Sequence, residues 1–234
     1  MRITWQTQLG VAALIVFAVV AAVLAAITPS IEKPGDNVVA FIEDLEDASL
    51  YRWVNLGFVA VFALSLWGFS TLPELLEDTK GGLLAQLGWL AYAPGGALLI
   101  AFIGADAIFI QMMRVAAYEA DSTLEQVIAR DLTLSYMDAG WIQAMALAAT
   151  ALWLLGLGLL ALAIYLADET PYWIDFPIAA GAVVLIVSGF IDQKFVSALG
   201  YLLLAVAFAG LGLIIWRART PTTPPPPTPA SPSA

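Results

Sequence analysis

Asp106 stands within a long apolar stretch, which makes it the first residue to consider for chemistry. Gly104 and Ala105 precede it, and an apolar run follows from Ala107 to Ile110. A carboxylate at the centre of a bilayer costs about 2.5–3.5 kcal/mol on insertion scales, so such a residue normally faces a bundle interior or water and has a polar partner. Asp106 is therefore our leading candidate for holding a proton, a cation or a polar headgroup.

Four further polar residues complete the candidate polar site. Gln111 and Arg114 follow Asp106 on the same segment, and Asp138 and Gln143 open the next apolar segment. If these two segments are antiparallel neighbours, Asp106 and Asp138 meet near one membrane face. The two carboxylates would then share one site.

The segment that carries Asp106 runs from Leu83 to Arg114 and is interrupted by Pro94-Gly95-Gly96. Proline lacks an N–H and clashes with the preceding turn, so we predict a bend at this helix break. A helix that begins at Leu83 covers about 34 Å by Asp106, more than the roughly 30 Å hydrocarbon core of a bilayer. The interpretation that we favour is therefore that Asp106 ends the span at the interface beside Arg114.

Composition assigns the chain to a membrane. Of its 234 residues 61% are apolar and only 12% are charged, against about 25% charged in a soluble domain. The core of a soluble protein of this length cannot absorb such long apolar runs, so their solvent is lipid. The predicted fold class is all-α, a polytopic integral membrane helix bundle.

Two missing residue types exclude most catalytic chemistry. The chain has no cysteine and no histidine, which removes disulfides, thiolate metal sites, His-ligated haem and nucleophile systems that need His. The net charge of −10 argues against nucleic-acid binding. We expect no catalytic residue, no cofactor and no metal. A carboxylate-only cation site at the acids of residues 43–47 is the alternative, but a solvated acidic face fits them better.

Six apolar segments predict six spans, joined by two longer polar connections that each carry an amphipathic surface helix. The first connection, residues 29–50, is acidic, and the second, residues 113–138, contains a capping box at Ser122–Glu125. Residues 1–219 form the transmembrane helical domain, and residues 220–234 a disordered Pro/Thr/Ser-rich tail. The predicted spans are Leu9–Ile27, Trp53–Leu72, Leu83–Arg114, Gly140–Leu166, Phe176–Ile191 and Phe195–Trp216.

An even number of spans places both termini on the same side of the membrane. Arg2, Arg217 and Arg219 lie at those ends, and the acidic connection lies opposite. Because basic residues flank spans on the cytoplasmic side, we predict a multi-pass protein of the bacterial plasma (inner) membrane with both termini cytoplasmic. The first span could instead be a cleaved signal peptide, although its length favours a retained helix. The expected partners are the lipid bilayer and either a membrane protein or a second copy.

The last third of the chain contains a series of features that is also seen in other membrane proteins. The long span Trp153–Leu166 is followed by the polar break Ala167–Thr170, the entry Pro171-Tyr172-Trp173 and a span containing Gly181. This order resembles small polytopic bacterial membrane proteins grouped in a domain family of unknown function. Tyr172 departs from the family's Pro-Trp-like entry. The resemblance implies a membrane fold and brings no catalytic residue.

Three function classes follow from these patterns. The leading hypothesis is a non-enzymatic integral membrane protein that acts through packing or partner contacts. The alternative is a small proton- or cation-coupled transporter using Asp106 and the Pro94-Gly95-Gly96 break, because broken helices frame ion sites in transporters. No inverted repeat supports that alternative. A membrane enzyme of unknown reaction comes third.

Overall fold

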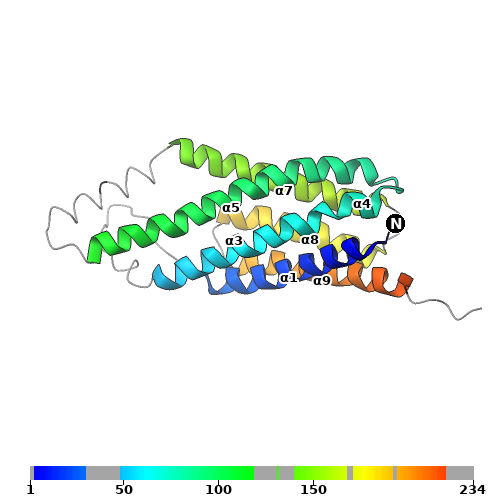
Figure 1. The fold of residues 1–234 in the computed structure, drawn as a ribbon, viewed down its shortest axis with the longest axis horizontal. Helices are drawn as coiled ribbons and strands as arrows, with labels where there is room; N and C mark the ends of the chain where they lie inside the picture. The colour runs from blue at the N-terminus through cyan, green and yellow to red at the C-terminus, as the bar shows by residue number, and fades with distance from the viewer. Residues whose placement is uncertain are drawn as a thin grey trace, which may run out of the picture.

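The computed structural model describes residues 3–29, 48–118, 131, 140–167, 171–191 and 194–219. Within the helices, the side chains of residues 48, 110–118, 143, 172, 189–191, 218 and 219 fall outside that description. The described chain is helical and contains no strand, which confirms the all-α class (Figure 1). The helices are α1 (Trp5–Ile27), α3 (Ala48–Ser70), α4 (Leu72–Leu76), α5 (Gly82–Tyr118), α7 (Gly140–Leu166), α8 (Tyr172–Ile191) and α9 (Lys194–Arg219).

The long helices match the predicted spans. Five of them are long and apolar enough to cross a membrane. The remaining one, α8, corresponds to the short fifth predicted span, and its apolar part is only Trp173–Ser188. The 20 residues of α8 still extend about 30 Å at 1.5 Å per residue. The first helix has a capping box, in which Thr4 and Thr7 each accept a hydrogen bond from the other's backbone N–H.

The six long helices form a ring. In order around it, α1 packs against α3, α3 against α5, α5 against α7, α7 against α8, α8 against α9, and α9 against α1 again. The least extensive of these contacts is that between α7 and α8. The short α4 touches α1, α3, α5 and α7 at one end of the ring. The start of α1 and the end of α9 lie at that same end (Figure 1), as an even number of crossings requires.

Aromatic side chains from five helices fill the middle of the ring. Phe17 of α1 contacts Phe62, Phe69 and Tyr201 with ring centroids 5.7, 6.5 and 5.8 Å apart, all edge to face. Such edge-to-face pairs are a favoured aromatic geometry. The cluster defined by these contacts, called the aromatic core below, consists of Phe17, Phe58, Phe62, Phe69, Trp89, Tyr92, Trp153, Tyr201 and Phe208.

Glycines bring α5 and α7 unusually close together. A Cβ added at Gly156 would collide with the backbone of Tyr92, and one added at Gly95 would collide with the backbone of Trp153. At Gly88 an added Cβ would lie 2.8 Å from Leu160 Cγ. Small residues allow this approach in membranes, where packing replaces the hydrophobic drive between helices.

The Pro94-Gly95-Gly96 sequence lies within a continuous helix, and the bend predicted at this position stays a prediction. Figure 1 shows α5 as one curved helix, and it is helical from Gly82 to Tyr118 with Pro94 inside it. Pro94 is exposed, so its missing hydrogen bond lies on the outer side. Gly95 packs directly against the backbone of α7, and Gly96 packs against Leu66 of α3. A Cβ added at Gly96 would lie 2.9 Å from Leu66 Cδ2. The glycines therefore serve close packing, and no unwound backbone offers an ion site here.

Several predicted features fall outside the described residues. These are the surface helix in residues 29–50, apart from its last residues, the capping box at Ser122–Glu125, Asp138 and the tail of residues 220–234. They stay predictions.

Candidate functional site

Asp106 is bound to α3 through its side chain. Its Oδ2 accepts a hydrogen bond of 2.6 Å from Tyr51 Oη and a longer one of 3.4 Å from Asn55 Nδ2. Tyr51 and Asn55 are four residues apart, so they lie one above the other on the same face of α3. Asn55 is only 8% exposed, whereas Asp106 is partly exposed. These three residues are called the rim group below.

Exposed aromatic side chains show the depth of the rim group. They gather at both ends of the bundle, as Trp and Tyr do at the two interfaces of a membrane. On α9 the aromatic residues Phe195 and Trp216 are separated by about 32 Å along the helix, close to the thickness of the hydrocarbon core. Because Tyr51 lies two residues before Trp53, the rim group lies at the level of one belt. The first belt contains Trp53, Trp141 and Phe195, and the second contains Trp5, Tyr165, Trp173 and Trp216.

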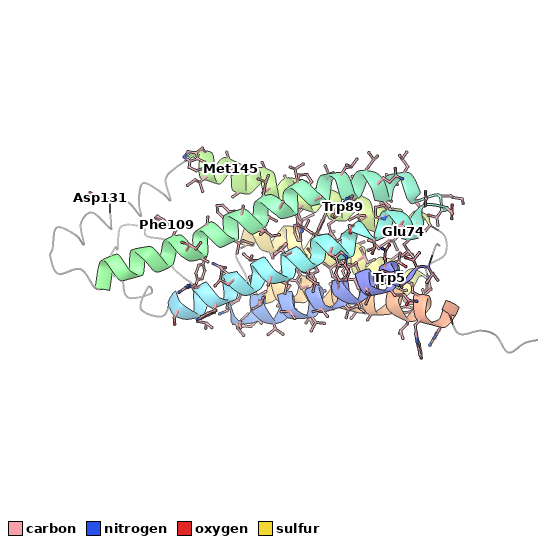
Figure 2. The ribbon with its side chains drawn as sticks, in the orientation of Figure 1. Trp5, Glu74, Trp89, Phe109, Asp131 and Met145 are labelled. Atoms are coloured by element: carbon pink, nitrogen blue, oxygen red, sulfur yellow. The ribbon has the colours of Figure 1, made fainter. Side chains whose placement is uncertain are left out.

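Of the predicted polar site, the described residues include only the Asp106 side chain, because Asp138 lies outside them. Gln111 and Arg114 continue along α5, and Gln143 lies on α7, but their side chains fall outside the described part. Figure 2 places Phe109 and Met145 on the helices α5 and α7 where these diverge. The described partners of Asp106 come from α3 instead. Sequence reading missed them because two polar residues four apart at the start of a span are also common at an interface.

A second polar group lies inside the aromatic core, and sequence reading missed it as well. Ser65 Oγ donates a hydrogen bond of 2.7 Å to the Phe62 carbonyl, and it lies 2.7 Å from Tyr92 Oη. Because the only hydroxyl proton of Ser65 is directed at Phe62, Tyr92 is the donor to Ser65. Trp153 completes the group, with a buried Nε1 that has no hydrogen-bond partner among the described residues. Ser65, Tyr92 and Trp153 are called the midplane cluster below.

The chemistry open to these groups is narrow. The rim group offers one carboxylate, which can hold a proton or contribute to binding one cation. Among the described residues there is no group of three or more potential metal ligands. The midplane cluster is neutral and offers only hydrogen bonds.

Comparison with known proteins identifies no relative. No family model matches the chain, and neither a curated protein nor a solved structure matches it. The resemblance of the last third to a family of small bacterial membrane proteins therefore stays a prediction, and function has to be argued from the chain's own residues.

Proposed function

We propose that the protein is a non-enzymatic multi-pass membrane protein that acts through contacts between its bundle and a second copy of the chain. The observation that carries this proposal is the filled interior of the ring. Tyr92, Phe17, Phe69 and Phe208 are all fully buried there, and they occupy the space that a carrier would need for a path. The buried Tyr92 hydroxyl donates to Ser65 Oγ, whose own proton goes to the Phe62 carbonyl.

The outer face of α7 supports a contact role. Gly158 is exposed, and a Cβ added to it would meet no atom within 4 Å. This differs from Gly156, which α5 contacts directly. The bundle itself therefore does not require glycine at 158. Ala144, Ala148 and Ala151 are exposed on the same face, with the exposed Leu155 between them and Gly158. This face therefore offers small residues and one leucine for packing against a further helix.

Thiol crosslinking tests this contact, because the native chain has no cysteine. The variant Gly158→Cys in native membranes should form a disulfide-linked dimer under mild oxidation. The matched control is Val206→Cys on the exposed face of α9, which should stay monomeric. An adduct of another mass at position 158 would identify a different partner. The absence of any adduct at position 158 would contradict the proposal.

We also propose that this membrane is the bacterial plasma membrane and that both termini are cytoplasmic. The support is the basic residues near the ends of the chain, Arg2, Arg217 and Arg219, together with the rule that such residues flank spans on the cytoplasmic side. Single cysteines at Ser49 and Ser231 test the orientation. An impermeant thiol reagent applied to intact cells should label position 49 only. Labelling of position 231 would reverse the assignment.

A proton- or cation-coupled carrier is the second candidate, and the rim group is the observation that favours it. The Asp106 carboxylate joins α5 to α3 through two hydrogen bonds and is still partly exposed. A substrate proton or cation could reach it from one side of the membrane. A membrane enzyme of unknown reaction stays the third candidate.

A further inference from the structure

The carboxylate of Asp106 has hydrogen-bond donors but no cation beside it. Both donors, Tyr51 Oη and Asn55 Nδ2, are neutral, and both bind the same oxygen, Oδ2. No basic side chain in the described part of the chain forms an ion pair with Asp106. Because a carboxylate that is largely removed from water is costly unless an opposite charge pairs with it, the rim group calls for a cation.

Arg52 carries the opposite charge on the same turn of α3. In the sequence it lies between Tyr51 and Asn55, the two residues that bind Asp106. Its guanidinium lies 5.7 Å from the ring centroid of Trp53, within the range of a cation–π contact. Trp53 is 65% exposed in the first aromatic belt. Arg52 forms no ion pair with a described carboxylate, so the two charges are not paired with each other.

The packing of α3 against α5 shows which way Arg52 faces. Val59 follows Arg52 by seven residues, or two helical turns, so the two residues lie on one face of α3. Val59 contacts α5, because a Cβ added at Gly104 would lie 3.6 Å from Val59 Cγ2. Gly104 is two residues before Asp106. Both charges therefore border the junction of α3 and α5, at the level of the belt where lipid headgroups surround the bundle.

We propose that this junction binds the headgroup of a phospholipid that carries a primary ammonium, such as an ethanolamine phospholipid. The ammonium donates to Asp106 Oδ1, the oxygen that the bonds from α3 do not use. The phosphate accepts from the guanidinium of Arg52, whose N–H groups match phosphate geometry. Arg52, Trp53 and Asp106 are called the headgroup site below. This site needs no path through the bundle, and it does not depend on the proposed contact through α7.

The two charges determine which lipids the headgroup site distinguishes. An ethanolamine headgroup supplies a partner to each of them. A choline headgroup has the same charges, but its quaternary ammonium has no N–H to donate to the carboxylate. A glycerol headgroup has no cation, and an inorganic cation alone would leave Arg52 without an anion. The expected order of binding is therefore ethanolamine lipid first, with choline and glycerol lipids clearly weaker.

Thermal unfolding of the full-length protein in detergent micelles tests this order, with one lipid added at a time. The three lipids share their acyl chains and differ only in the headgroup. At about ten times its dissociation constant, the ethanolamine lipid should raise the melting temperature by about 3–6 °C, and the other two by less than half of that shift. Equal shifts with all three lipids would overturn the proposal. So would a shift of the same size with soluble phosphoethanolamine, because the ligand would then not be a lipid.

Two variants locate the preference at the headgroup site. Asp106→Asn keeps the shape of the side chain and removes the anion, so the advantage of the ethanolamine lipid over the glycerol lipid should disappear. Arg52→Gln removes the partner of the phosphate and should reduce the shift with all three lipids. The matched control is Asp78→Asn, an exposed carboxylate in the connection between α4 and α5 at the other end of the bundle, which should retain the wild-type order. An ethanolamine preference that survives in Asp106→Asn would contradict the proposal.

Discussion

The rim group contains a charged side chain and the midplane cluster only neutral ones, and the two lie at different depths of the same bundle. The rim group holds a carboxylate at the level of an aromatic belt, where α3 supplies both donors to Asp106. The midplane cluster is neutral and enclosed, and it draws one residue from each of α3, α5 and α7. Charge is thus kept where water can reach it, and neutral hydrogen bonds are used where water cannot.

Helix packing also differs between the two regions, and it is tighter at the midplane cluster. At the depth of the midplane cluster, Gly156 of α7 touches the backbone of Tyr92 so closely that no Cβ fits between them. Near the rim group, a Cβ added at Gly104 would lie 3.6 Å from Val59 Cγ2, an ordinary contact. The contact between α5 and α7 at Gly156 is therefore tighter than the contact between α5 and α3 at Gly104.

The same substitution at both depths should give the largest difference. Gly156→Ala pushes α5 away from α7 and should destabilise the protein by about 2–3 kcal/mol, as overpacking of a dense core does. Gly104→Ala adds a methyl group in available space and should be neutral, or stabilising by about 0.5–1 kcal/mol because helical glycine is costly. Reversible unfolding in mixed micelles measures both. Equal effects at the two positions would remove the contrast in packing.

Loss of the Tyr92 hydroxyl should have an intermediate effect. Tyr92→Phe keeps the ring contacts with Phe69 and Trp153 but removes the donor to Ser65. Ser65 keeps its bond to the Phe62 carbonyl, so the expected loss is about 1–2 kcal/mol. The same unfolding assay measures it, with Tyr165→Phe at the exposed belt as the control that should change little. A neutral Tyr92→Phe would mean that the hydroxyl contributes nothing to the core.

Neutralising the carboxylate at the rim should have the smallest effect. Asp106→Asn keeps the shape of the side chain and an oxygen that can accept from Tyr51. Because the site is partly exposed, the expected change in unfolding free energy is within about 0.5 kcal/mol. A loss larger than that of Tyr92→Phe would show that the charge is structurally buried, contrary to its position at the belt.

Helix positions were largely predictable from sequence, because apolar run length and flanking polar residues determine where a span begins and ends. The predicted span Gly140–Leu166 coincides with α7. The packing role of Gly95 and Gly96 was not predicted, since local rules pointed only to a bend at Pro94. Packing against Trp153 and Leu66 instead requires glycines within an uninterrupted helix.

The partners within each polar group could not be predicted. Asp106 is 55 residues from Tyr51 along the chain, and Ser65 is 27 residues from Tyr92. Such pairs depend on how each helix is rotated about its axis. Nearly uniform apolar spans do not encode that rotation as a periodic pattern. Ser65 and Tyr92 were also not singled out, because isolated hydroxyls are common in membrane helices.

Ion flux in reconstituted vesicles tests most directly whether the bundle is a contact protein or a carrier. The wild-type protein and Asp106→Asn would be compared under a pH gradient and under a potassium gradient, with empty vesicles as the baseline. A ring filled by the aromatic core should pass no more than the baseline in either form, and the two proteins should not differ. Flux through the wild-type protein that Asp106→Asn abolishes, while the variant remains folded, would contradict the account and establish the rim group as a transport site.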